Sequence, residues 1–282
     1  MKVILLEDHK APVVVLQVWY RVGSRNETPG ATGLSHLLEH MMFKGTDRVG
    51  PEEYNRIIQR NGGQTNAFTS QDYTTYFATI ASDRVGVVAD LEADRMVNLK
   101  INDALYGPER NVVKEERRLR TENNPVGDLV EQLNATAYVA HPYRAPIIGW
   151  MSDLDRSTLE DLIQHYRTYY VPNNAFVVAA GDFDSQQLLA DLERVFGSIP
   201  SGALPPPVRS MEPLQRGERR VELRREAELP FVAIAYHIPN LRSADAAALE
   251  VLAAVLSGGK SARLHQELVY RRRLTRDADA SK

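Results

Sequence analysis

Four prolines between Leu204 and Gly217 limit what this chain can fold into more than any other feature. The segment LPPPVRSMEPLQRG can continue neither a helix nor a sheet, because proline lacks a backbone donor and fixes its φ angle. We therefore predict a linker over residues 204–217 that divides the chain. Residues 1–203 then have to bury a core of their own, and 282 residues leave room for this.

The residues before this linker alternate between strand-like and helix-like patterns. The β-branched and aromatic run Val13–Val22 is typical of a strand, and turn-rich sequence follows it. The Thr-rich stretch Thr65–Ile80 predicts one extended strand, and Ala175–Ala180 predicts a short buried one. The sequence therefore predicts one domain that mixes these strands with helices over Leu34–Phe43, Pro51–Arg60, Asp83–Asn98, Glu109–Glu122, Val126–Tyr138, Ser157–Tyr170 and Gln186–Phe196.

The residues after the linker repeat the opening order. Phe231–His237 is strand-like, a loop follows, and Ala244–Leu256 predicts a helix that ends at two glycines. This order matches that of Val13–Gly45. We therefore expect residues 218–282 to be the incomplete start of a second, homologous domain, with the chain ending inside it.

Composition removes several classes of protein. Lys plus Arg number 34 and Asp plus Glu 37, a net charge of −3, so a nucleic-acid partner is not expected. Because the chain has no cysteine, histidine and carboxylate groups have to hold any metal. No apolar run reaches the roughly 18 to 20 residues of a membrane span. No signal-peptide pattern precedes the strand-like residues Val3–Leu6.

The pattern that carries chemistry is His36-Leu37-Leu38-Glu39-His40. On a helix, His36, Glu39 and His40 share a sector about 100° wide, and the leucines face another side. Two imidazoles one turn apart suit one divalent ion, and a carboxylate beside them suits proton transfer. The alternative is a chance match, and a catalytic zinc site needs a third protein ligand. We expect the other histidines, which have no partner at ligand spacing, to be structural or solvent-exposed: His9, His141, His165, His237 and His265.

A second helix offers candidates for the third ligand. Glu109 and Glu116 are seven residues apart and nearly superpose on one face, with Val112 and Val113 in the same stripe. We expect this stripe to point inward, where carboxylates need a cation or hydrogen-bond donors. A surface ion pair is the alternative for Glu116. Glu115 points away, into a solvated charged run where ion pairs within the helix are expected.

These residues resemble the inverted zinc motif H-x-x-E-H of the inverzincins, the pitrilysin and insulin-degrading family, which includes mitochondrial processing peptidase and its bacterial relatives. In that family the third ligand is a Glu about 75 to 80 residues after the second histidine, with a supporting Glu two helical turns before it. Glu116 stands 76 residues after His40 and 7 after Glu109. The resemblance covers nearly the whole chain, through the sequences GLSHLLEHMMFKGT, NAFTSQDYTTY, HPY, YVPNNA and LSGGKSARLHQEL.

The resemblance implies an α+β fold, in which helices pack on one face of a mixed β-sheet and a second, similar domain follows. Two such domains make a half-shell, and two half-shells enclose a chamber for peptides. The implied partner is therefore a homologous subunit, in a homodimer or a heterodimer. The bacterial periplasm is the favoured compartment, with the cytoplasm as the alternative.

The resemblance also implies a function and the residues that perform it. The chain would be a zinc metalloendopeptidase that cleaves peptides or unfolded protein segments inside the closed chamber. His36, His40 and Glu116 would bind one zinc ion per chain, and Glu39 would take a proton from the metal-bound water as general base. Glu109 would orient a ligand from outside the coordination sphere.

The family also suggests where a substrate lies. Asn66, Ala67 and Phe68 match the edge strand along which family members align an extended peptide by main-chain hydrogen bonds. The alternative for this Thr-rich segment is an ordinary half-exposed strand. The natural substrate and the cleavage preference do not follow from the sequence.

One departure from the family concerns its second domain. That domain usually carries an Arg and, seven residues later, a Tyr that contact substrate near the zinc. Val269 and Arg276 stand at these positions here. This suggests a zinc-bearing subunit that is active only with a partner, in which case the isolated chain cleaves poorly. The remaining alternative is a non-catalytic structural homologue, against which the intact HLLEH and Glu116 argue.

Overall fold

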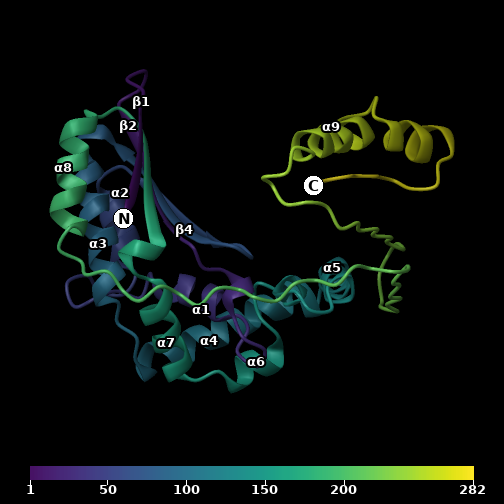
Figure 1. Cartoon of the computed structure of the whole chain (residues 1–282), viewed down its shortest axis with the longest axis horizontal. Coiled ribbons are helices and arrows are strands. Elements are labelled where there is room, and N and C mark those ends of the chain that lie inside the picture. The colour runs from purple at the N-terminus through teal and green to yellow at the C-terminus, as the bar shows by residue number, and fades with distance from the viewer. The chain divides into compact units, whose positions relative to one another are not determined.

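A five-stranded sheet forms the centre of the fold (Figure 1). The computed structural model describes residues 1–282, which form two units, Met1–Ala233 and Ile234–Lys282, and the sheet lies in the first. The strand order is β1-β5-β2-β4-β3. β1 and β5 are parallel and the other neighbours antiparallel, so the sheet is mixed. The strands are β1 (Lys2–Glu7), β2 (Val13–Tyr20), β3 (Gln64–Thr69), β4 (Thr74–Ala81) and β5 (Ala175–Gly181).

One face of this sheet is buried. Successive side chains of a strand point to opposite faces, and in β2 only the alternate residues Val14, Leu16, Val18 and Tyr20 are buried. The helices α2 (Glu53–Arg60), α3 (Val85–Asn98) and α8 (Ser185–Phe196) lie along the sheet (Figure 1). The predicted α+β fold, with helices packed on one face of a mixed sheet, is confirmed.

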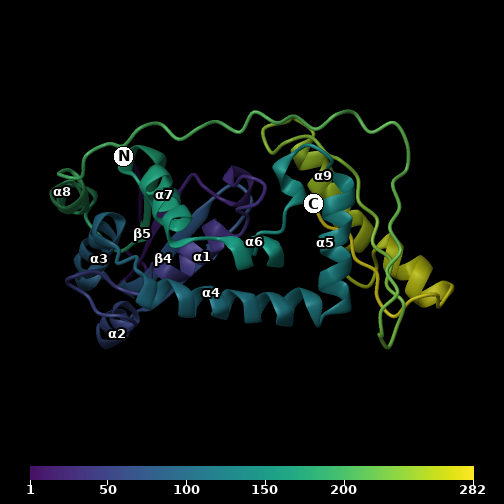
Figure 2. The ribbon, with the colours of Figure 1, turned by 90° about the horizontal axis from the view of Figure 1, so that it is seen from below.

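The other helices of the first unit gather at one end of the sheet (Figure 1). A π-helical turn, Arg118–Glu122, joins α4 to α5, and the two helices run in different directions (Figure 2). The helices gathered at this end of the sheet are α1 (Leu34–Met41), α4 (Asp103–Arg117), α5 (Pro125–Ala137), α6 (Met151–Arg156) and α7 (Leu159–Tyr169).

The second unit is helical. It contains α9 (Ala246–Ser257) and a π-helical segment, His265–Arg271. Across the whole structure, none of the helices combines the length and the apolar character that crossing a membrane requires.

Two predictions about strands are wrong. The stretch Thr65–Ile80 is a hairpin, because residues 70–73 turn between β3 and β4 and the Ser70 amide donates to the Tyr73 carbonyl at 2.8 Å. Phe231–His237 is mostly exposed and forms no strand, because no neighbouring strand pairs with its backbone. The other predicted elements are present with shifted ends, and α6 was not predicted.

The proline-rich segment 204–217 contains neither helix nor strand. Its residue Glu212 accepts hydrogen bonds from the amides of Val139, Ala140 and His141, just after α5, at 2.9–3.1 Å. These amides hold the pKa of Glu212 at about 2, although burial opposes the shift. The segment is thus attached to the first unit at this point, and the domain boundaries at residues 203 and 218 stay a prediction.

Buried polar groups fix the N-terminal end of α1. The carboxylate of Glu27 accepts hydrogen bonds from the amides of Gly33 and Ser35, both at 2.7 Å. The Ser35 hydroxyl lies 3.1 Å from Nε2 of His165, a buried residue of α7. Gly33 has φ of +90°, and a Cβ there would lie 2.6 Å from the carbonyl oxygen of Ile148. These hydrogen bonds and this close backbone contact together hold the start of α1 in place.

His165 is expected to make the first unit acid-sensitive. Burial lowers the pKa of His165 from 6.5 to about 4, so the folded chain keeps this ring neutral. Below pH 6.5 the unfolded chain binds the proton first, so the stability from the neutral ring is present above pH 6.5 and is lost towards pH 4. In His165→Gln this loss should disappear, a difference of about 2 kcal/mol at pH 5. Urea unfolding at pH 7 and pH 5 measures it.

The matched control is His9→Gln. His9 is exposed, and its hydrogen bond with Asp182 raises its pKa, so its removal cannot reproduce the effect. An equal loss of unfolding free energy between pH 7 and pH 5 in the parent and in His165→Gln would contradict the assignment.

Candidate metal centre

α1 separates an apolar face from a polar one, as its sequence predicts. Leu37, Leu38 and Met41 are completely buried in the core. His36 and His40 lie on the other side with their ring centroids 4.8 Å apart, and His36 is 8% exposed. Packing of the apolar face thus holds two imidazoles side by side.

α4 lies against α1 and brings two carboxylates to these imidazoles. Oε2 of Glu116 lies 3.3 Å from Nε2 of His40 and 3.8 Å from Nε2 of His36. Oε1 of Glu109 lies 2.9 Å from Nδ1 of His40. The two glutamates therefore take opposite sides of the His40 ring. Glu116 shares one centre with both Nε2 atoms, and Glu109 binds the far nitrogen.

The groups at this centre fit a zinc ion. His36, His40 and Glu116 each offer one ligand atom, and these atoms lie within 4.8 Å of one another. In tetrahedral zinc sites, bonds of about 2.0–2.2 Å separate the ligand atoms by about 3.3–3.6 Å. The distances of 3.3 and 3.8 Å from Glu116 to the two imidazoles are close to this spacing. Two histidines and a glutamate are also a ligand set that catalytic zinc uses. The ligand roles of these residues stay a prediction.

The two histidines differ in protonation. Burial, and then the neighbouring His40, lowers the pKa of His36 to about 4, so this ring is neutral at pH 7. Burial also acts to lower the pKa of His40, but its hydrogen bonds with Glu109 and Glu116 outweigh burial and raise that pKa to about 9. The hydrogen bond from His40 lowers the pKa of Glu116 in turn. A metal ion bound at this centre would therefore have to displace a proton from His40.

Glu39 follows on the same face of α1 and is held by Thr69, at the end of β3. The Thr69 hydroxyl donates to Oε2 of Glu39 at 2.6 Å. Burial raises the pKa of Glu39, while this hydrogen bond opposes the rise. A carboxylate with a raised pKa and a fixed orientation is suited to accept and return a proton near neutral pH.

Sequence reasoning missed two residues that hold this site, Thr69 and Lys44. Nζ of Lys44 lies 2.8 Å from Oε2 of Glu109, so Lys44 balances the charge of that carboxylate. Lys44 follows His40 by four residues, a spacing that would place both on one face of a continued helix, although α1 ends at Met41. The contact between Thr69 and Glu39 had no such signal, because 30 residues separate them.

The inward stripe expected on α4 is partly wrong. Val113 is completely buried, but Val112 is 49% exposed. Glu109 is also buried. The inward face of α4 therefore lies on the side of Glu109 and Glu116 that carries Val113, not on the side that carries Val112. Glu115 is exposed and pairs with a neighbouring arginine within the helix, as expected.

Asn66, Ala67 and Phe68 lie on β3, at the edge of the sheet. β3 pairs with β4 on one side, so its other side offers backbone donors and acceptors to an added strand. Asn66 and Phe68 are exposed. The substrate role of these residues stays a prediction.

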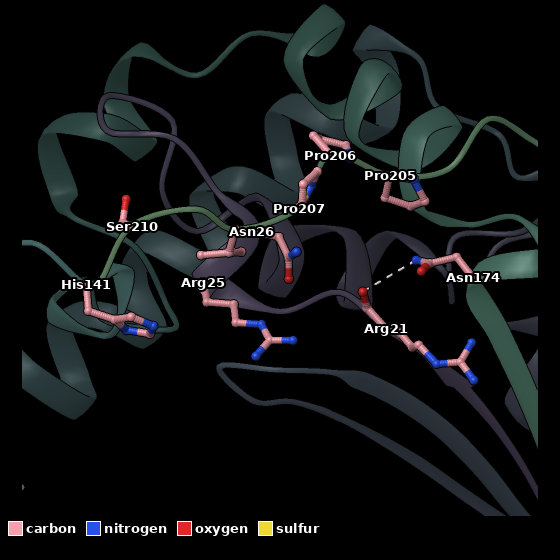
Figure 3. Close-up of a pocket in the computed structure, with 10 residues that line it drawn as sticks. Arg21, Arg25, Asn26, His141, Asn174, Pro205, Pro206, Pro207 and Ser210 are labelled. Carbon is pink, nitrogen blue, oxygen red and sulfur yellow. Dashed lines mark hydrogen bonds between the residues drawn. The ribbon is translucent and has the colours of Figure 1, made fainter. Parts of the chain in front are cut away.

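A separate hollow of about 380 Å³ is lined neither by the residues of the candidate metal centre nor by those of β3 (Figure 3). Arg25, in its wall, pairs with Asp72 at 2.9 Å. The hollow is lined by Arg21, Arg25, Asn26, His141, Asn174, Pro205, Pro206, Pro207, Val208 and Ser210.

Curated proteins similar to this chain include several named zinc proteases. The chain is 38% identical over 275 residues to zinc protease PqqE of Helicobacter pylori, a match that covers 96% of this chain and 62% of that protein. It is 30% identical to the uncharacterized zinc protease YmxG of Bacillus subtilis, with 95% and 64% covered. The probable mitochondrial-processing peptidase subunit beta of Arabidopsis thaliana is 31% identical over 68% of this chain and 36% of that protein. The chain thus spans less than two thirds of the length of these relatives.

Solved structures agree with the fold. A protease from Helicobacter pylori superposes with a TM-score of 0.88 at 34% identity, covering 98% of this chain and 68% of that one. The first half of the periplasmic protease PqqL from Escherichia coli gives a TM-score of 0.66 at 22% identity, covering 73% and 45%, and supports the fold alone. Residues 2–150 match the description "Insulinase (Peptidase family M16)", and residues 156–281 match "Peptidase M16 inactive domain". The chain therefore belongs to the insulinase family, peptidase family M16.

Proposed function

We propose that this chain carries the catalytic zinc centre of a metalloendopeptidase and binds one zinc ion. The observation that carries the proposal is the convergence of the Nε2 atoms of His36 and His40 on Oε2 of Glu116, with Glu39 on the same helix face. The relatives named zinc proteases support it.

The residues around the centre have distinct roles in this proposal. Zinc held by His36, His40 and Glu116 supplies a Lewis acid that polarises the scissile carbonyl and acidifies a water. Glu39 accepts the proton of the attacking water and returns it to the leaving amine. Thr69 keeps the Glu39 carboxylate in place through its hydrogen bond.

Glu109 and Lys44 set the orientation of one metal ligand. Glu109 accepts the Nδ1 proton of His40, so Nε2 of that ring is left to face the centre. The ammonium group of Lys44 lowers the pKa of Glu109 together with His40, against the effect of burial. Glu109 thus stays an acceptor at neutral pH.

We further propose that the substrate is an extended peptide or an unfolded protein segment. Such a segment would add to the open edge of β3 and pair with the main chain at Asn66, Ala67 and Phe68. The reaction space is the closed chamber between two half-shells, formed in a homodimer or a heterodimer with a homologous subunit. A periplasmic location, with the cytoplasm as its alternative, stays a prediction.

A second candidate function follows from Val269 and Arg276. These residues occupy the positions of the expected Arg and Tyr, so a partner subunit would supply the substrate-binding pair. In this alternative the chain provides zinc and is active only in the mixed complex. A non-catalytic homologue is the third possibility, and the intact set of metal and base residues argues against it.

Zinc content tests the ligand set. The parent chain should retain one zinc ion after dialysis, and Glu116→Gln should lose most of it because a ligand is removed. Glu109→Gln should keep zinc with an affinity about 10- to 100-fold weaker, because only the support of His40 is lost. Metal analysis by mass spectrometry and chelator competition give both numbers.

Glu115→Gln is the matched control for these variants, because Glu115 neighbours Glu116 but is exposed and points away from the centre. It should bind zinc like the parent. Equal zinc loss in Glu115→Gln and Glu116→Gln would contradict the ligand assignment, and a parent that takes up no zinc at neutral pH would favour the non-catalytic homologue.

Peptide cleavage tests the base. In the full-length protein, Glu39→Gln should keep its zinc and lose about 10²- to 10⁴-fold in kcat, because proton transfer is lost. Thr69→Val should give a smaller fall in kcat, because Glu39 remains but is no longer held. Cleavage of a quenched fluorescent, unstructured peptide measures both. Full cleavage by zinc-loaded Glu39→Gln would rule out Glu39 as the base.

Mixing experiments separate the first two candidate functions. If the chain acts without a different partner, the full-length protein alone should cleave the peptide as fast as any mixture with a homologous subunit from the same organism. A rate that appears only in the mixture would favour the partner-dependent alternative.

A further inference from the structure

The two carboxylate oxygens of Glu116 face different partners. Oε2 faces the imidazoles, 3.3 Å from Nε2 of His40 and 3.8 Å from Nε2 of His36. Oε1 instead pairs with Nη1 of Arg120 at 2.8 Å. Arg120 lies four residues after Glu116, one turn further along the helix, in the π-helical segment Arg118–Glu122. The carboxylate is thus shared between the proposed metal centre and a guanidinium.

The number of oxygens that Glu116 gives to an ion determines the room left at that ion. A catalytic zinc site keeps three protein ligands and leaves the fourth position to water. A second oxygen from the same carboxylate would add a ligand and crowd that position. We propose that Arg120 is a positioning residue that occupies Oε1 of Glu116 and thereby makes Glu116 a one-oxygen ligand. This inference rests on the proposed zinc centre.

The backbone of Arg120 is fixed by a close contact with α5. A Cβ added to Gly127 would lie 2.1 Å from the carbonyl oxygen of Arg120, so α5 approaches this carbonyl as only glycine permits. Two residues further on, the carbonyl of Glu122 accepts a hydrogen bond from Arg225. The backbone of the turn that carries Arg120 is therefore held by contacts on both sides. These contacts fix the position from which the Arg120 side chain extends.

Charge alone would give a different result from positioning. The guanidinium repels a divalent cation bound at Oε2, so its removal without any other effect would strengthen metal binding and leave the ligand number unchanged. Positioning predicts a change in the ligand number itself. The Arg120 side chain is 70% exposed, whereas that of Glu116 is 18% exposed. Removing the guanidinium therefore leaves the fold in place, because exposed ion pairs contribute little to stability.

The test uses Co²⁺ as a spectroscopic probe in the full 282-residue chain. Four-coordinate Co²⁺ absorbs visible light strongly, and a fifth ligand weakens this absorption. The parent should show the intense spectrum with one Co²⁺ per chain. Arg120→Ala should bind the same amount of Co²⁺ with a clear loss of absorption, because both oxygens of Glu116 then reach the ion.

Arg118→Ala is the matched control. Arg118 lies in the same turn and also pairs with a glutamate of α4, but its partner is Glu115, which points away from the centre. Its spectrum should equal that of the parent. The proposal is overturned if Arg120→Ala keeps the intense spectrum, if Arg118→Ala loses it equally, or if the parent spectrum is already weak.

The outcome also separates this inference from the proposed function. A parent that binds no Co²⁺ or Zn²⁺ removes the metal centre and the role of Arg120 together. The metal centre stands if the parent shows the intense Co²⁺ spectrum and Glu116→Gln does not. If Arg120→Ala then has the same spectrum as the parent, only the role of Arg120 is removed.

Discussion

The contact between α1 and α4 is the interaction on which the rest of the site depends. α1 turns its leucines into the core, and this leaves His36 and His40 on a face that the second helix covers. Imidazoles in such a position need partners, because an unpaired buried polar group is costly. Glu109 and Glu116, two turns apart on α4, supply them for His40, one on each side of its ring. The contacts that stabilise the packing of α1 against α4 are therefore the same contacts that bring the residues of the metal centre together.

This contact requires α1 to begin at a defined point. Gly33 and Gly149 both have positive φ, and a Cβ on Gly149 would lie 2.5 Å from the carbonyl oxygen of Thr32. The backbone before α1 and the backbone before α6 thus approach each other more closely than side chains would allow. Asp153, at the start of α6, accepts hydrogen bonds from the amide and the hydroxyl of Thr32. The site is positioned by backbone contacts outside it as much as by its own side chains.

Much of the fold and the two halves of the metal cluster could be predicted from local spacing, and the resemblance to the family joined the two halves. His36 and His40 are one helical turn apart, and Glu109 and Glu116 two turns, so each pair shares a face before any tertiary contact forms. The hairpin within Thr65–Ile80 was missed because its turn, Ser-Gln-Asp-Tyr, contains neither glycine nor proline. Contacts between distant elements, such as Thr69 with Glu39, depend on how the sheet edge meets α1, and spacing does not carry that information.

The parallel pairing of β1 with β5 has a consequence for synthesis. β1 is the first strand of the sheet in the chain and β5 the last, and β5 pairs with both β1 and β2. Until residues 175–181 have left the ribosome, β1 lacks its partner and one edge of β2 is open. Unpaired strand edges invite association with other chains, and closing so long a loop is slow. The nascent sheet is thus exposed to aggregation until β5 has been made, so chaperone protection matters most before β5 emerges.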